Sequence, residues 1–184
     1  MSKHLLVVNG HPDPRPERFC SALCDAYARG AAAGGWDVRR LDAGMLNLVP
    51  VSDETAMCPP GVAAAVEQIC KADRLAVAFP LWIDGPPGSL NELFERAARA
   101  QWSSAPADTN SATYEKPARV IVTMDMPAFI QRSRAGSDGA AKRAFSIPGL
   151  QMVEPLFVGS LQSLTAAQRN DWLEKVRLLG AQEE

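Results

Sequence analysis

The sequence predicts an α/β fold, an open, doubly wound sheet of five mainly parallel strands with helices on both faces. Short apolar runs alternate with segments of helical periodicity, as in βαβ units with right-handed crossovers. The apolar runs are nearly continuous, which is typical of parallel strands buried on both sides. At 184 residues, with 47% hydrophobic and 22% charged, the chain suits one domain over residues 1–184 with a full core.

Five segments are predicted as strands. The three central ones are Leu5–Val8, Leu75–Phe79 and Val120–Thr123. Val38–Leu41 is less apolar and is expected at an edge. The fifth, Met152–Val158, contains Pro155, which indicates an edge position or a bulge because proline cannot donate to the strand ladder.

Four segments have the apolar spacing of helices. The first carries Phe19, Leu23, Ala26, Tyr27 and Gly30 and is expected to end at Gly34–Gly35. The second follows Pro59–Pro60 and carries Val62, Val66, Ile69 and Cys70; the third carries Leu90, Leu93, Phe94 and Ala97. The last begins at a Thr165–Gln168 capping box, carries Trp172, Leu173, Val176 and Leu179, and is expected to stop at Gly180.

Three further segments lie between these elements. Lys142–Arg143 is expected on a crossover helix. Residues 44–60 and 102–116 lack clear periodicity and are expected to be irregular, as lids, partner surfaces or mobile loops are.

Composition excludes several classes of function. A net charge of -2 and a pI near 5.7 give no field for non-specific nucleic-acid binding. The first apolar run is too short for a membrane span or a signal peptide, so we expect a cytoplasmic protein without membrane insertion. Four cysteines without a CxxC pair, and only two histidines, argue against a zinc or dithiol site.

Three loops of unusual composition follow predicted strands: NGHPDPRPERFC, FPLWIDGPPGSL and TMDMPAF. Ligands of doubly wound sheets bind at the carboxyl ends of the strands, so we expect the loops to converge there. The first loop precedes a helix N-terminus and carries arginines, which suits a phosphate. Neither GxGxxG nor a P-loop is present, which favours a flavin tail over ATP. A stiff proline turn with a solvated Arg18 is the alternative.

The same loops carry a family resemblance. The chain resembles the flavodoxin-like NAD(P)H:quinone oxidoreductases. The resemblance lies in VVNGHPDP with RFC, then FPLW, then ARVIVTMDMPAF, AKRAF and the closing WLEKVR. That family includes modulators of drug activity and ancillary subunits of potassium-efflux systems. The resemblance implies a flavodoxin-like fold, bound FMN or FAD, hydride transfer from NAD(P)H through the flavin to a quinone or similar small acceptor, and a homodimer.

The resemblance assigns roles to three groups of residues. The phosphate and ribityl chain would contact His11, Arg18, Phe19 and Cys20. The backbone along the flavin ring would be that of Pro80, Leu81, Trp82 and Ile83. The opposite side would be closed by Thr123, Met124 and Asp125, with backbone N–H groups near the polar edge of the ring. Phe129 would form one wall of the pocket that NAD(P)H and the acceptor share. The resemblance implies no metal and no catalytic side chain.

Departures from the family pattern leave a second function open. Arg18 replaces a small hydroxyl residue, Ile83 and Asp84 stand where an aromatic residue and a glycine are common, and residues 102–116 lack the family's aromatic segment. FMN, or no flavin, therefore gains support over FAD. The alternative is a non-catalytic flavodoxin-like regulatory or ancillary subunit with weak or no flavin binding. A phosphoacceptor receiver-like domain is disfavoured, because its first loop would be acidic.

Three of the assigned residues have simpler structural interpretations. Trp82 is also compatible with a core tryptophan, although the flanking prolines favour a ligand role. His11 could cap its own turn. Asp125 could form an Asx turn before Met126 and Pro127.

Overall fold

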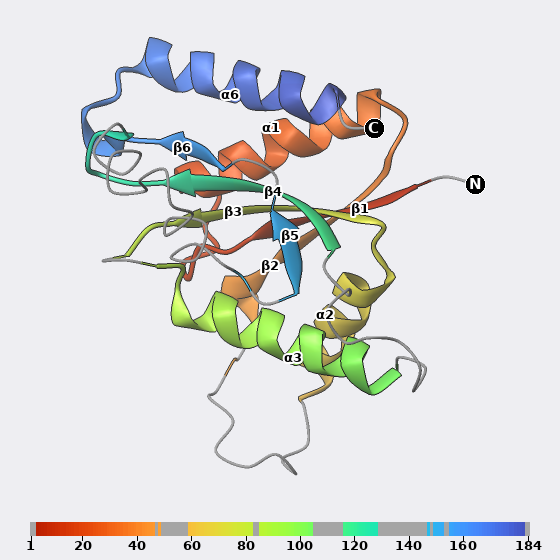
Figure 1. The fold of residues 1–184 in the computed structure, drawn as a ribbon. Helices are drawn as coiled ribbons and strands as arrows, with labels where there is room; N and C mark the ends of the chain where they lie inside the picture. The colour runs from red at the N-terminus through yellow and green to blue at the C-terminus, as the bar shows by residue number, and fades with distance from the viewer. Residues whose placement is uncertain are drawn as a thin grey trace.

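The protein was analysed as a computed structural model that describes residues 3–46, 48, 59–82, 85–104, 116–128, 147, 149–152 and 155–182. The fold has three layers, with a central sheet between two layers of helices (Figure 1). The strands are β1 (His4–Asn9), β2 (Asp37–Asp42), β3 (Arg74–Pro80), β4 (Lys116–Thr123), β5 (Leu150–Met152) and β6 (Leu156–Val158). The helices are α1 (Phe19–Ala33), α2 (Pro60–Lys71), α3 (Gly88–Ser104) and α6 (Ala166–Ala181), with short 3-10 turns η1 (Ala43–Met45) and η3 (Leu161–Ser163).

The sheet has the expected doubly wound order. Its strands run β2-β1-β3-β4-β5, and each neighbouring pair is parallel. Helices α1 and α6 cover one face, and α2 and α3 cover the other (Figure 1). Because β1 lies between β2 and β3, the winding reverses beside β1, and this is where such sheets bind ligands. The sequence prediction of the fold class is confirmed.

The fifth predicted strand is in fact two strands. β5 pairs with the start of β4 through Lys116–Ala118, and β6 pairs with its end through Ile121–Thr123. Pro155 lies between β5 and β6, where a missing N–H interrupts the ladder. The proline was therefore read correctly as an edge feature, but the single strand Met152–Val158 was wrong.

Local signals set the end of α1 and the start of α6. Gly34 caps α1, and Gly35 follows with φ +92°, a conformation that favours glycine. At α6 the capping box forms as predicted: the Gln168 N–H donates to Thr165 Oγ1 at 3.2 Å, and the Thr165 N–H donates to Gln168 Oε1 at 2.9 Å.

Gly180 is not the helix stop that the sequence suggests. Helix α6 continues through Ala181, and Gly180 is buried where α6 crosses α1. A Cβ on Gly180 would lie 2.3 Å from the Tyr27 carbonyl oxygen, and one on Gly30 would lie 1.9 Å from the Arg177 carbonyl oxygen. The two glycines therefore allow the helix backbones to approach closely, which is a tertiary reason that local patterns do not reveal.

One other expectation changes at the second helical layer. Helix α3 continues to Ser104, so the segment predicted to be irregular from residue 102 starts later than expected. Ile83, Asp84, Phe129 and the crossover helix expected at Lys142–Arg143 lie outside the described residues. No described helix is both long and apolar enough to cross a membrane.

Candidate functional site

A cavity of about 230 Å³ lies at the carboxyl ends of β1, β3 and β4. It collects residues from the first loop, from the end of β3 and from the start of α6, segments far apart in the sequence. Its lining is His11, Glu17, Arg18, Phe19, Cys20, Pro80, Thr123, Leu161, Gln162 and Arg169. Six of the residues assigned from the sequence, His11, Arg18, Phe19, Cys20, Pro80 and Thr123, thus line one cavity at the expected rim of the sheet.

Asn9 organises the first loop from the end of β1. Its side chain is fully buried; Nδ2 donates to Asp42 Oδ1 at 2.8 Å, and Oδ1 accepts the His11 N–H at 3.2 Å. His11 Nδ1 in turn accepts the Asp13 N–H at 2.9 Å. His11 therefore both caps the turn and lines the cavity. Partial burial, followed by the charge of Arg18, lowers the pKa of His11 below its usual value.

Asp13 holds both arginines of this loop. Arg15 donates to its carboxylate from Nε at 2.9 and 3.0 Å and from Nη2 at 2.6 Å. Arg18 donates to Asp13 Oδ2 from Nε at 2.7 Å, with Nη2 at 2.5 Å. These hydrogen bonds hold the pKa of Asp13 well below its usual range. The loop is therefore less cationic than its sequence suggests, since one carboxylate is shared by two guanidinium groups.

Helix α1 begins at this cavity without a side-chain cap. Its N-cap residue is Arg18, whose guanidinium cannot accept a hydrogen bond. Ser21 and Ala22 donate to the Arg18 carbonyl. The N–H group of Phe19 has no acceptor among the described residues, and that of Cys20 bonds only to its own thiol sulfur. Unpaired N–H groups at a helix N-terminus favour an anion. An anionic ligand here would meet those two amides and the Arg18 side chain.

Cys20 and Thr123 form the buried floor of the cavity. Cys20 Sγ lies 3.2 Å from Thr123 Oγ1, and both residues are almost fully buried. Burial raises the pKa of the Cys20 thiol to about 11, so the thiol is protonated at neutral pH. This pair can hydrogen-bond a ligand, but it does not supply a thiolate.

Arg169 is a site residue that the sequence analysis missed. It comes from the start of α6 and lies over the Phe19 ring, with its guanidinium carbon 5.1 Å from the ring centre. Its Nη2 donates to the Leu161 carbonyl at 2.8 Å. The one local signal is that an arginine near a helix N-terminus opposes the helix dipole.

The second and third loops contribute less to this cavity than the first. Trp82 is 54% exposed and forms an antiparallel bridge with Gly85, so it is not a core tryptophan. Leu81 donates its N–H to the Thr123 carbonyl and packs partly against the core. The Met124 side chain is buried, and its N–H already donates to the Val158 carbonyl. Exposed Asp125 accepts a hydrogen bond from Gln162 Nε2 at 3.0 Å.

Among the described residues, no group of three His, Cys, Asp or Glu side chains is placed to hold an ion. The doubly wound parallel sheet, with an arginine-lined cavity at its switch point, defines a flavodoxin-like α/β protein. The chain belongs to the family described as flavodoxin-like fold, whose model matches residues 3–178. The family resemblance inferred from the sequence is thereby confirmed, although no curated protein matches the sequence.

Solved structures share the fold at low sequence identity. An NAD(P)H:quinone oxidoreductase from Methanothermobacter marburgensis is 18% identical over 98% of this chain and 96% of that one, with a TM-score of 0.68. An azoreductase from Bacillus anthracis is 15% identical over 98% of this chain and 100% of that one, with a TM-score of 0.64. The apo form of an NADH:FMN oxidoreductase is 20% identical, covering 99% and 92%, with a TM-score of 0.57.

Proposed function

We propose that the protein is a flavin-dependent oxidoreductase that passes hydride from NAD(P)H through a bound flavin to a quinone or similar small acceptor. The observation that carries the proposal is the cavity at the strand switch, which Arg18, Phe19 and Cys20 line at the uncapped start of α1. The structural neighbours named as quinone oxidoreductase, azoreductase and NADH:FMN oxidoreductase support it.

The residues present fit the phosphate end of a flavin. Arg18, the N–H groups of Phe19 and Cys20, and His11 would hold the phosphate, while Thr123 would face the ribityl chain. Pro80 and the exposed Trp82 would flank the ring. Asp125, Ile83 and Phe129 keep their assigned roles as part of the proposal, whereas Met124 does not, because its N–H already donates to the Val158 carbonyl. A bound flavin would supply the two-electron redox chemistry. The chain's own residues would bind and orient the flavin. The Cys20 thiol, which stays protonated, would not act as a nucleophile.

The test is visible absorption of the purified protein, before and after titration with FMN, FAD and riboflavin. We expect FMN or FAD to bind and riboflavin to bind more weakly, because riboflavin lacks the phosphate. NADH or NADPH added without oxygen should bleach the flavin band, and a quinone should restore it. A protein that binds none of the three flavins would contradict the proposal.

One observation favours a second candidate function. Arg18 is already held by Asp13, which weakens the attraction that a flavin phosphate would feel. A non-catalytic flavodoxin-like regulatory or ancillary subunit would bind flavin weakly or not at all. Absence of flavin binding, or bound flavin without turnover of NAD(P)H and quinone, would favour this candidate. We further propose a homodimer, which light scattering of the purified protein would test.

A further inference from the structure

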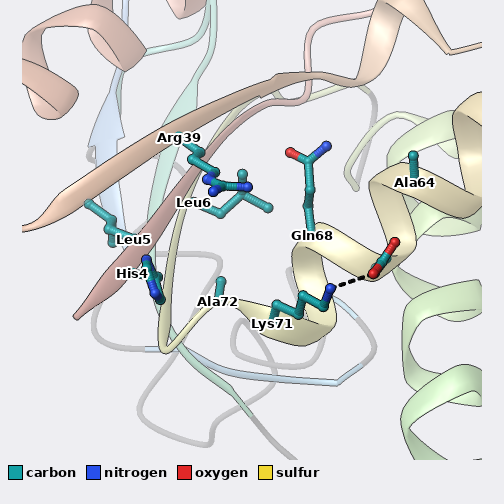
Figure 2. Close-up of a pocket in the computed structure, with 9 residues that line it drawn as sticks. His4, Leu5, Leu6, Arg39, Ala64, Gln68, Lys71 and Ala72 are labelled. Atoms are coloured by element: carbon teal, nitrogen blue, oxygen red, sulfur yellow. Dashed lines mark hydrogen bonds and ion pairs between the residues drawn. The ribbon is translucent and has the colours of Figure 1, made fainter. Parts of the chain in front are cut away.

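A second, larger cavity of about 520 Å³ lies at the opposite end of the sheet, between β2 and α2 (Figure 2). It is near the amino end of β1, where the strand begins at His4, whereas the first cavity follows the carboxyl end of the same strand. Its lining is His4, Leu5, Leu6, Arg39, Ala64, Glu67, Gln68, Lys71 and Ala72. The function proposed above uses none of these residues.

Strand register places a charged side chain beside an apolar floor in this cavity. Arg39 of β2 pairs with Leu6 of β1, so their side chains lie on the same face of the parallel sheet. Its neighbour Arg40 points to the other face, where it bonds Asp42 and, on α1, Ser21 Oγ at 2.8 Å. Arg39 therefore faces the α2 side, and Leu6, which is 2% exposed, lies next to it.

The polar groups of the cavity differ in how they are satisfied. Arg39 has no hydrogen bond or ion pair among the described residues, and neither does the side-chain amide of Gln68. Arg39 and Gln68 extend into the space between β2 and α2 from opposite sides (Figure 2). Lys71, in contrast, is paired with Glu67 on the same helix, and His4 with Asp37. One uncompensated positive charge remains in the cavity.

We propose that this cavity binds a small organic carboxylate with an apolar body. The carboxylate would take the planar, two-pronged guanidinium of Arg39 and a hydrogen bond from the Gln68 amide. The apolar body would cover Ala64, which is exposed, above the buried side chains of Leu6 and Ala72. The volume falls within the range of small-molecule sites, about 300–1,000 Å³.

The charges of the lining distinguish a carboxylate from other ligands. A dianion such as a phosphate would meet only one cation without a partner among the described residues, so its second charge would stay uncompensated. Arg39 is exposed, so a neutral apolar molecule would leave its charge to water and would gain nothing from it. A monoanion with apolar surface matches both the single charge and the apolar floor.

The test is a nuclear magnetic resonance titration of the 15N-labelled protein with benzoate, and with benzamide as its neutral analogue. We expect benzoate to shift the amide signals of residues around Arg39, Gln68 and Lys71, and benzamide to bind at least tenfold more weakly. Equal affinity for the two, or benzoate shifts confined to the first loop and the start of α1, would overturn the proposal.

Two substitutions and one control sharpen the test. Arg39→Gln should weaken benzoate binding at least tenfold, and Ala64→Leu should weaken it by filling the cavity while leaving the charge in place. Arg29→Gln removes an exposed arginine from α1, on the other face of the sheet, and should leave the affinity unchanged. Unchanged benzoate affinity in both cavity variants would refute the assignment, and loss in Arg29→Gln would show that only net charge matters.

Discussion

The arginines at the two ends of the sheet are held in different ways. At the carboxyl ends, Arg18 is bonded to Asp13 and Arg169 to the Leu161 carbonyl, so both guanidinium groups have fixed partners within the chain. At the amino ends, Arg39 has no partner among the described residues. The first cavity is organised before any ligand arrives, and its ligand must compete with Asp13. The second offers an uncompensated charge, but less preorganisation.

The largest expected effect concerns the residue that organises the first cavity. Asn9→Ala removes the buried donor to Asp42 and the acceptor of the His11 N–H. We expect the free energy of unfolding to fall by about 2–3 kcal/mol, because buried polar partners are left unpaired. Urea denaturation measures it, with the exposed Asn170→Ala as control, which should change it by less than about 0.5 kcal/mol. Equal effects would mean that Asn9 does not organise the loop.

The next effect tests whether Arg18 remains available despite Asp13. Arg18→Ala should lower the affinity for FMN about tenfold to hundredfold, the loss of one charged hydrogen bond, and leave riboflavin binding unchanged. Fluorescence titration of the two flavins measures the difference. Arg15→Ala is the matched control, because Arg15 also bonds Asp13 but does not line the cavity. A similar loss for riboflavin would place Arg18 at the ring or the fold rather than at the phosphate.

A smaller effect in the opposite direction is expected from Asp13. Asp13→Asn removes the carboxylate that competes for Arg18 and that repels a phosphate. FMN affinity should therefore rise about threefold to tenfold, with riboflavin unchanged. The same titration measures it. Weaker FMN binding in this variant would mean that Asp13 orients Arg18 for the ligand. Pairing with Asp13 would then help ligand binding, contrary to the comparison with Arg39 made above.

The smallest effect is a pH dependence of stability from His11. Its pKa in the folded protein lies below the usual value of 6.5, so the neutral form is favoured by folding. This contribution is present above about pH 6.5 and is lost as the pH falls through the folded pKa, because protonation removes the acceptor of the Asp13 N–H.

His11→Asn supplies the matched comparison for that pH dependence, since its side-chain oxygen keeps an acceptor and does not titrate. Urea midpoints at about pH 7.5 and pH 5.5 should fall more for the wild-type protein than for the variant. An equal fall in both would assign the dependence to other groups.

Much of the fold could be predicted because its signals are local. Continuous apolar runs identified β1, β3 and β4, and the capping box identified the start of α6. The three loops after the strands could be placed at one rim, because parallel strands end on the same side of a sheet. The family resemblance of the same loops also predicted six of the residues that line the cavity.

The errors arose where contacts join distant segments. Gly180 was read as a stop because glycine commonly ends helices, yet its role depends on Tyr27, a residue of another helix. Arg169 was missed because its place above Phe19 exists only after α6 folds back over α1. The division of the last strand depends on β4, which accepts one short strand at each end.

The sequence by itself determined the order of helices and strands, the parallel sheet and the composition of the rim, because hydrophobic periodicity and capping act over a few residues. The tertiary structure decided which charges are paired. Asp13 holds Arg18, while Arg39 faces an open cavity between β2 and α2. Ion pairing depends on distance in space, and only folding sets the distance between side chains of separate elements.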